Sequence, residues 1–326
     1  MSLPARHAVE GDGSARRGLA LALLAALFWA TGGLAAKWLF TPLAGAAEGW
    51  PVPPLGIVID PVVLAAARAV VAAAALWAGL ALKAREHLRV RAKDLPFLTA
   101  FGVVGLALVH FSYFKTISLT NVATAILLEY MAPVLVLTVS SLAAPRGIGW
   151  RLPVAVALSV SGCALVVGAL SGRLAVSFQG LAWGLASAVF FAAYTVMGRW
   201  GASRYTPWTL LAYGLAAAAA FWLVVLGPAP VFHALSDGPT AAAVVYIALA
   251  STILPFGAFL AALRLIPATE ASVAATLEPV IAAVGAWVLL GERLDVWQIL
   301  GGVLVLGGIV AAQEPGPGGR EVPPAG

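Results

Sequence analysis

The sequence predicts an all-α polytopic membrane protein, with ten transmembrane helices arranged as two inverted five-helix repeats. The first observation is composition: 62% of the 326 residues are hydrophobic and only 10% are charged, against about 25% charged residues in soluble domains. The second is a series of apolar runs of about 20 residues, each long enough to cross a hydrocarbon core of roughly 30 Å as a helix. The third is an internal repeat, described below.

The apolar runs define the expected spans, and the polar stretches outside them define tails and loops. Residues 1–17 are expected to form a disordered cytoplasmic tail, because they are polar and rich in small residues, and residues 313–326 a second one, because proline and glycine interrupt them. Arg16-Arg17 also fits a twin-arginine signal peptide, but the run after it continues through Lys37-Trp38 and is long enough to span. The expected spans are residues 18–40, 61–82, 95–114, 121–144, 153–171, 178–199, 207–227, 241–263, 270–290 and 296–312.

Lysine and arginine are distributed unevenly over the loops. With the N-terminus inside, fourteen of the 19 Lys and Arg residues fall in inside segments, four fall outside, and Arg68 lies within a span. Such residues are retained on the cytoplasmic side of membrane proteins. The sequence therefore predicts a multi-pass protein of the cell membrane with both termini in the cytoplasm.

Two constant offsets relate the halves of the chain. An offset of 146 residues places Pro133 on Pro279 and Gly162 on Gly308, and an offset of 162 places Lys37-Trp38 on Arg199-Trp200. Because each half holds an odd number of spans, the halves must have opposite topology, as in secondary transporters whose sites lie near mid-membrane between the repeats. We expect a first repeat over residues 18–171 and a second over residues 178–312.

Several motifs carry a resemblance to a known family. They are LEPVIAAVGAWVLLGERL at 277–294, LLEYMAPVLVLTVSSL at 127–142, FWATG at 28–32, and Arg68 in the second span. In these motifs the chain resembles the EamA family of the drug/metabolite transporter superfamily. The resemblance implies ten helices in two antiparallel repeats, and transport of small metabolites such as amino acids and their relatives. One departure is that the Gly-Glu-Arg-Leu stop at 291–294 has no counterpart after the fourth span, so Glu292 is interpreted as a surface residue that caps a helix junction.

Three ionisable residues lie deep in the expected spans. Glu129 lies about 12 Å below the outer face, Glu278 about 12 Å above the inner face, and Arg68 close to the level of Glu129. A carboxylate at this depth indicates a functional site, and we expect the two acids to line one polar cavity. Arg68 is expected to pair with Glu129, which could also be a purely structural ion pair. Glu278 lacks a cationic neighbour, so it is the candidate for proton coupling, since burial favours the neutral acid.

The remaining candidates surround these charges. Pro133 and Pro279 occupy matched positions, where each frees a backbone carbonyl one turn earlier; the alternative is that they only kink helices for packing. Aromatic and hydroxyl side chains at inner positions are candidate substrate contacts, although Trp and Tyr also anchor spans at the membrane interface. These are Trp29, Thr31, Tyr113, Tyr130 and Tyr194, with Asn121 and His110 as weaker candidates.

The motifs that are absent narrow the function. There is no GxxxxGK[ST], HExxH or CxxC pattern, so we predict no enzyme activity, cofactor or metal, and the loop-borne basic residues give no reason to expect nucleic acid. We predict a secondary transporter or facilitator that moves a small polar, amino-acid-like metabolite across the cytoplasmic membrane, in the export direction. The expected partners are that substrate, the lipid bilayer and protons as coupling ion. The glycines of the last span are expected to permit close helix packing, with a homodimer surface as the alternative. The alternative is a non-transporting structural or interaction membrane protein on the same fold.

Overall fold

The computed structural model describes eleven stretches of the chain. They are residues 5–43, 49–54, 56–132, 134–136, 138, 151–166, 176–202, 204–262, 265–266, 274–275 and 277–313. No strand occurs within these ranges.

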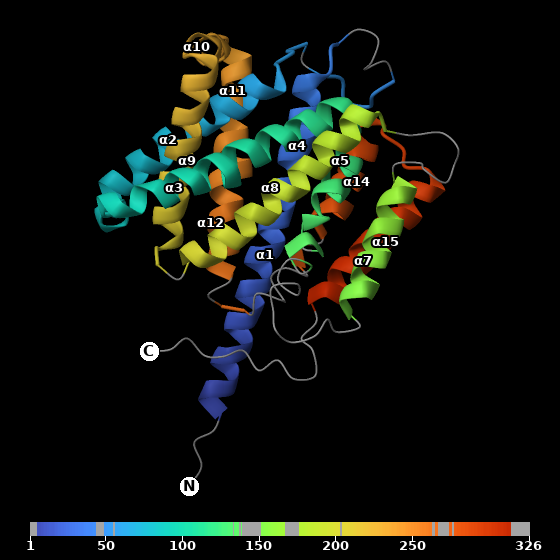
Figure 1. Ribbon diagram of the computed structural model, residues 1–326, viewed down its shortest axis with the longest axis horizontal. Helices are drawn as coiled ribbons and strands as arrows, with labels where there is room; N and C mark the ends of the chain where they lie inside the picture. Colours follow the sequence, from blue (N-terminus) through green and yellow to red (C-terminus); the bar gives the residue numbers. More distant parts are fainter. Residues whose placement is uncertain are drawn as a thin grey trace.

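The helices pack lengthwise into one bundle (Figure 1). The first half holds α1 (Ala5–Phe40), α2 (Pro61–Lys83), η1 (Arg85–Leu88), η2 (Ala92–Asp94), α3 (Leu95–Gly102), η3 (Val103–Ala107), α4 (Leu108–Leu119), α5 (Val122–Glu129) and α7 (Arg151–Val166). The second half holds α8 (Phe178–Ala202), α9 (Pro207–Leu226), α10 (Ala229–Ser236), α11 (Gly238–Ala248), η4 (Leu249–Ile253), α12 (Leu254–Ala262), α14 (Leu277–Leu290) and α15 (Val296–Gln313).

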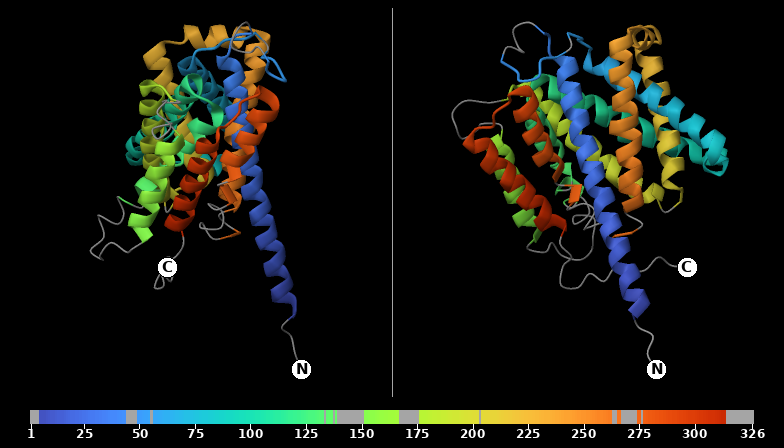
Figure 2. Two further views of the ribbon diagram at one scale, coloured as in Figure 1. Left: turned by 90° about the vertical axis from the view of Figure 1, so that its right-hand side faces the viewer. Right: turned by 180° about the vertical axis from the view of Figure 1, so that it is seen from behind.

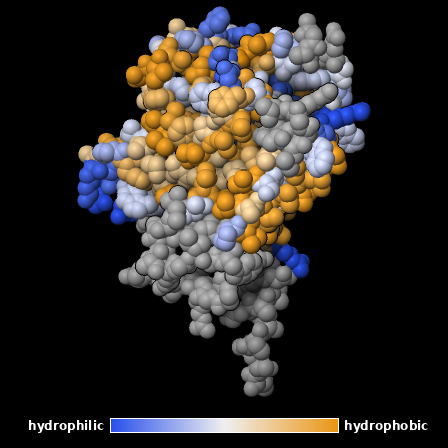
Figure 3. All heavy atoms as spheres, turned by 45° about the vertical axis from the view of Figure 1, so that its right-hand side comes forward, coloured by the Kyte–Doolittle hydropathy of each residue, from blue (hydrophilic) through white to orange (hydrophobic). Residues whose placement is uncertain are grey.

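The apolar helices make this a polytopic membrane protein. In the described part of the chain, six helices are long and apolar enough to cross a bilayer: Ala15–Phe40, Pro61–Lys83, Ala92–Leu119, Phe178–Gly198, Pro207–Leu226 and Gly238–Phe259. Four shorter apolar helices cover Val122–Val136, Pro153–Val166, Leu277–Leu290 and Val296–Ala311. Hydrophobic side chains occupy the middle of the face shown in Figure 3, and hydrophilic ones gather towards its edges.

Three features differ from the expectation. The first helix begins at Ala5 rather than after residue 17. Extending an existing helix by further turns costs little free energy. The N-terminal part of this helix projects from the bundle (Figure 2). A short helix that was not expected, α10, lies between two spans. The segments η3 and η4 are π-helical turns that interrupt the third and eighth spans, and such turns often mark functional sites in helices.

The glycines of the last span permit close helix packing, as expected. A Cβ at Gly162 in α7 would lie 2.5 Å from the Gly301 oxygen in α15. A Cβ at Gly308 in α15 would lie 2.9 Å from the Ala155 oxygen in α7. The two helices therefore approach each other closely through backbone at two places, and both contacts need a residue without a side chain.

The loops gather at two ends of the bundle. At one end, which we call the 41–60 end, the Ile59 N–H donates to the Leu39 carbonyl at 2.9 Å and the Val52 N–H to the Leu289 carbonyl at 3.0 Å. At the other, the 84–94 end, the Thr209 hydroxyl donates to the His87 carbonyl at 2.8 Å. The helices thus run between these two sets of loop contacts, with the acidic residues between them.

Candidate functional site

The centre of the site is a contact between the end of α5 and the start of α14. The Tyr130 hydroxyl lies 2.9 Å from Oε2 of Glu278 and 2.9 Å from the carbonyl oxygen of Ala275. Tyr130 is 8% exposed and Glu278 9%. The structure therefore brings together two sequence candidates from opposite halves of the chain.

Pro279 explains why the Ala275 carbonyl needs this hydroxyl. In a helix that carbonyl would accept the amide N–H of residue 279, and proline has none. The carbonyl freed by Pro279 was expected from the sequence, and the structure identifies its donor as Tyr130. Residues 274–275 are helical, as is α14 from Leu277 onward, and residue 276 lies outside the described residues, so the kink expected at Pro279 stays a prediction.

The Tyr130 hydroxyl carries one hydrogen and has two acceptors within bonding distance. It can donate to only one of them fully. If it donates to the Ala275 carbonyl, Glu278 can bond to it only as a neutral acid that donates its own proton. If Glu278 is ionised, the hydroxyl turns to the carboxylate and leaves the carbonyl without a donor. The geometry therefore links the protonation of Glu278 to the backbone at the start of α14.

Glu129 lies beside Tyr130 as the last residue of α5. The Ser187 hydroxyl from α8 donates to its Oε2 oxygen, and Glu129 interacts electrostatically with Glu278. Ser187 is fully buried, and sequence reasoning missed it. The only available signal was that it is a polar side chain inside an expected apolar span.

Arg68 does not pair with Glu129 as expected. Its Nη2 lies 2.6 Å from Nε2 of His110 in α4, and its guanidinium carbon lies 5.3 Å from the centre of the Phe114 ring. Arg68 still interacts electrostatically with Glu129, but its hydrogen bond goes to α4 rather than to α5. Arginine only donates hydrogen bonds, so His110 must accept through Nε2 and carry its hydrogen on Nδ1.

Two buried polar atoms at this site lack a partner among the described residues. Arg68 is 4% exposed, and its Nε makes no hydrogen bond. The Tyr113 hydroxyl is also unpaired, faces Gly33 of α1, and interacts electrostatically with Arg68, Glu129 and Glu278. Since buried polar groups are normally satisfied, these two atoms are available to a ligand.

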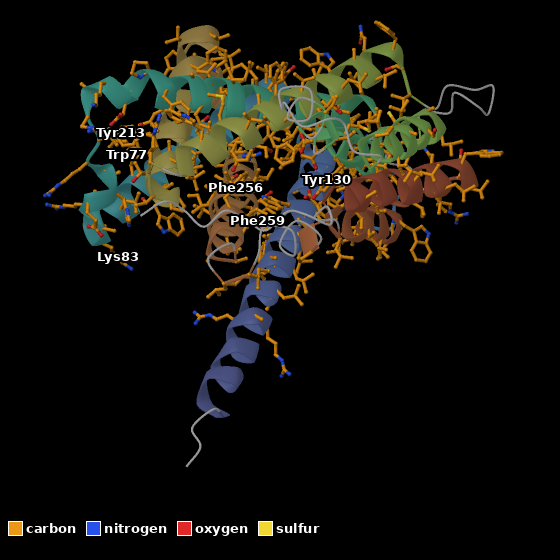
Figure 4. The ribbon with its side chains drawn as sticks, turned by 60° about the horizontal axis from the view of Figure 1, so that its bottom comes forward. Trp77, Lys83, Tyr130, Tyr213, Phe256 and Phe259 are labelled. Carbon is orange, nitrogen blue, oxygen red and sulfur yellow. The ribbon has the colours of Figure 1, made fainter. Side chains whose placement is uncertain are left out.

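Aromatic rings line the other side of the site. Phe256 of α12 lies 5.4 Å from Trp29, 5.8 Å from Tyr194 and 6.5 Å from His110, measured between ring centres. Figure 4 shows Phe256 and Phe259 in the middle of the view, between the Trp77–Tyr213 group and Tyr130. Trp29 and Tyr194 thus connect to the polar cluster through Phe256 and His110.

The remaining candidates do not join the cluster. The Thr31 hydroxyl donates to the Phe28 carbonyl and accepts from Tyr246, both at 2.9 Å. Asn121 caps the start of α5 by accepting the Thr124 N–H at 2.7 Å. Pro133 lies outside the described residues. Within the described ranges, no group of three or more His, Cys, Asp or Glu side chains could hold a metal ion.

Comparison with known proteins places the chain in a family. The profile of the EamA-like transporter family matches residues 16–168 and again residues 178–312. An uncharacterized inner membrane transporter of Salmonella typhimurium, YicL, is 26% identical over 315 residues, covering 91% of this chain and 95% of that protein. A solved crystal structure superposes with a TM-score of 0.58 at 20% identity, covering 90% of this chain and 96% of its own.

Two relatives carry names that specify a cargo. The threonine/homoserine exporter RhtA of Escherichia coli is 28% identical over 230 residues, covering 67% of this chain and 69% of that protein. A probable terminal-alkyne amino-acid exporter of Streptantibioticus cattleyicolor is 28% identical over 229 residues, covering 68% and 74%. With both halves of the chain matching one profile, the protein belongs to the EamA-like transporter family.

Proposed function

We propose that the protein is a secondary transporter that exports a small, amino-acid-like metabolite, with protons as coupling ion and both termini in the cytoplasm. The observation that carries the proposal is the buried contact of Tyr130 with Glu278 and the Ala275 carbonyl. Polar and ionisable groups at such depth are costly and occur on substrate and ion pathways. The two relatives named as amino-acid exporters support the substrate class.

The proposal includes two inverted repeats, and the π-helical turns support it. The offset of 146 residues that relates Pro133 to Pro279 also carries Val103–Ala107 onto Leu249–Ile253, the bounds of η3 and η4. An irregular turn has no reason to recur at one offset unless the two segments share an origin.

The packing of α7 on α15 supports the same symmetry. The offset carries Ala155 to position 301 and Gly162 to position 308, so the contact of Gly162 with Gly301 maps onto the contact of Gly308 with Ala155. When the offset converts one contact between two helices into a second contact between the same two helices, the helices are related by a two-fold axis. Transporters built in this way place the substrate site near that axis and alternate its access by moving one repeat against the other.

The polar groups of the site match the charges of an amino acid. Arg68 offers a buried Nε donor without a partner among the described residues, suited to a carboxylate. Glu129 and Glu278 offer carboxylates suited to an ammonium group. The unpaired Tyr113 hydroxyl interacts electrostatically with all three charged side chains, and the rings of Trp29 and Phe256 provide an apolar wall for the side chain of the substrate.

Proton coupling follows from the two acceptors of Tyr130. When Glu278 binds a proton, the hydroxyl is free to satisfy the Ala275 carbonyl and α14 keeps its first turn intact. When a substrate ammonium displaces that proton, the hydroxyl turns to the carboxylate and the carbonyl loses its donor. Proton and substrate would then compete for one carboxylate, which is the requirement for exchange of one against the other.

Flux in proteoliposomes tests the proposal. The purified protein should move radiolabelled threonine or a related amino acid in the direction opposite to the flow of protons down an imposed gradient, and Glu278→Gln should remove the dependence on that gradient. Glu86→Gln, which alters an exposed carboxylate at the 84–94 end, should keep it. Folded protein that moves none of a panel of amino acids, sugars, nucleosides and amines would instead favour the alternative, a non-transporting structural or interaction protein.

A further inference from the structure

The turn between α4 and α5, at the 41–60 end, is held by two charged side chains from distant parts of the chain. Lys37, in the last turn of α1, donates through Nζ to the carbonyls of Thr120 and, at 3.1 Å, Ile117. Glu292, which follows α14, accepts the N–H of Val122 through Oε2 at 3.2 Å. The turn is therefore bonded to both halves of the chain.

The signs of these charges fit the helix ends that they contact. The last carbonyls of a helix carry partial negative charge and the first amides partial positive charge. Lys37 lies at the carbonyl end of α4, and Glu292 at the amide end of α5. The two side chains also interact with each other electrostatically. Glu292 caps a helix junction as the sequence predicts, but it is half-buried rather than a surface residue.

The backbone after α14 is shaped to direct Glu292 towards α5. Gly291 has a φ of +65°, a left-handed conformation that glycine adopts without strain. The Glu292 N–H then bonds back to the Ala286 carbonyl at 3.1 Å. A segment of the 41–60 loop closes over this end of α14, because the Val52 carbonyl accepts Trp38 Nε1 at 3.0 Å while its N–H bonds to α14.

These contacts lie directly between the 41–60 end and the acidic cluster. Helix α5 begins at the turn that Lys37 and Glu292 hold and ends at Glu129, about 11 Å further along its axis. Helices α5 and α14 pack against each other between this end and the acids, and the Glu292–Val122 bond is a direct link between the end of α14 and the start of α5.

We propose that Lys37 and Glu292 form the gate on the 41–60 side of the substrate path. The gate rests on the proposed transport function, because it assigns these residues to one half of an alternating-access cycle. In the structure the gate is closed. Opening requires Glu292 to release the Val122 amide so that α5 can move away from α14, and Lys37 to release the Ile117 and Thr120 carbonyls so that the turn can move away from α1.

Thiol labelling tests the gate without a substrate. The chain has one cysteine, Cys163, so Cys163→Ala gives a cysteine-free background. Ile126 lies one turn below Val122 on α5 and is 1% exposed, so Ile126→Cys reports access past the gate. An impermeant thiol reagent is applied to vesicles of both orientations, which makes the result independent of the assigned topology.

Glu292→Ala and Lys37→Met should each raise the labelling rate from the 41–60 side roughly tenfold. Losing one charge-assisted hydrogen bond shifts an equilibrium by about this factor. Glu292→Gln should give a smaller rise, because its amide oxygen can still accept the Val122 N–H. The matched control is Asp60→Asn. The Asp60 carboxylate lies at the same end but caps only its own helix, α2, so this variant should leave the labelling rate unchanged.

Three outcomes would refute the proposed gate, and a fourth outcome distinguishes failure of the transport proposal from failure of the gate. The gate is wrong if labelling from the 41–60 side stays at the parent rate in both Glu292 variants and in Lys37→Met. It is also wrong if Asp60→Asn raises labelling equally, or if access rises equally from both sides, since either result means general loosening. If the gate variants raise labelling as expected while the parent protein carries no flux, the contact controls access and the transport proposal alone fails.

Discussion

Replacing Tyr130 with phenylalanine removes one oxygen and leaves the ring in place. In the structure that oxygen lies 2.9 Å from the Ala275 carbonyl, which has no amide donor because residue 279 is proline, and 2.9 Å from Glu278. An orphaned buried acceptor costs about 1–3 kcal/mol. Tyr130→Phe should therefore lower the free energy of unfolding by about 1–3 kcal/mol and lower the melting temperature by a few degrees.

Pro279→Ala separates the two acceptors. Alanine restores the N–H that Ala275 lacks, so the carbonyl no longer depends on Tyr130. In the Pro279→Ala background, Tyr130→Phe should cost about 1 kcal/mol less than in the parent protein, the value of one net hydrogen bond. The coupling is measured as a double-mutant cycle by thermal unfolding in detergent, followed by tryptophan fluorescence.

Tyr246→Phe is the matched control for this cycle. It also removes a tyrosine hydroxyl, but one that bonds to Thr31 at an exposed site. Its cost should stay within about 0.5 kcal/mol, as for most surface changes, and should not depend on residue 279. Additive effects of Tyr130→Phe and Pro279→Ala would refute the argument that proline creates the acceptor that Tyr130 serves.

Three further predictions concern coupling, packing and topology. Glu278→Gln mimics the protonated acid, so it should fold with wild-type yield while flux loses its pH dependence; a wild-type pH profile of the mutant would make Glu278 structural. Gly162→Ala should destabilise the protein by several kcal/mol in a melting assay, because its Cβ would meet a backbone oxygen of α15 at 2.5 Å, whereas Gly307→Ala, with open space around it, should be neutral; equal effects would contradict the close-packing argument. In the cysteine-free background, an external thiol reagent should label Val58→Cys and spare Arg89→Cys, and the reverse pattern would invert the orientation.

The sequence alone was sufficient where the physics is local. Apolar runs long enough to cross a bilayer predicted the helices, because a helix satisfies its own backbone in lipid. The carbonyl freed by Pro279 followed from the spacing of helical hydrogen bonds, since donor and acceptor are four residues apart whatever the tertiary structure. Burial of Glu278 followed from its place inside an apolar run, and the structure places it with 9% exposure.

Only the tertiary structure decided which side chains meet. Tyr130 is 145 residues from Ala275, and Glu292 is 170 residues from Val122. Arg68 turned to His110 instead of Glu129, although all three lie at comparable depth in the expected spans. Depth follows from counting residues along a helix, but a contact also requires the rotation and tilt of each helix, which are set by packing of its neighbours. The sequence therefore predicted the burial of Arg68 and Glu278 but not of Ser187, and packing determined their partners.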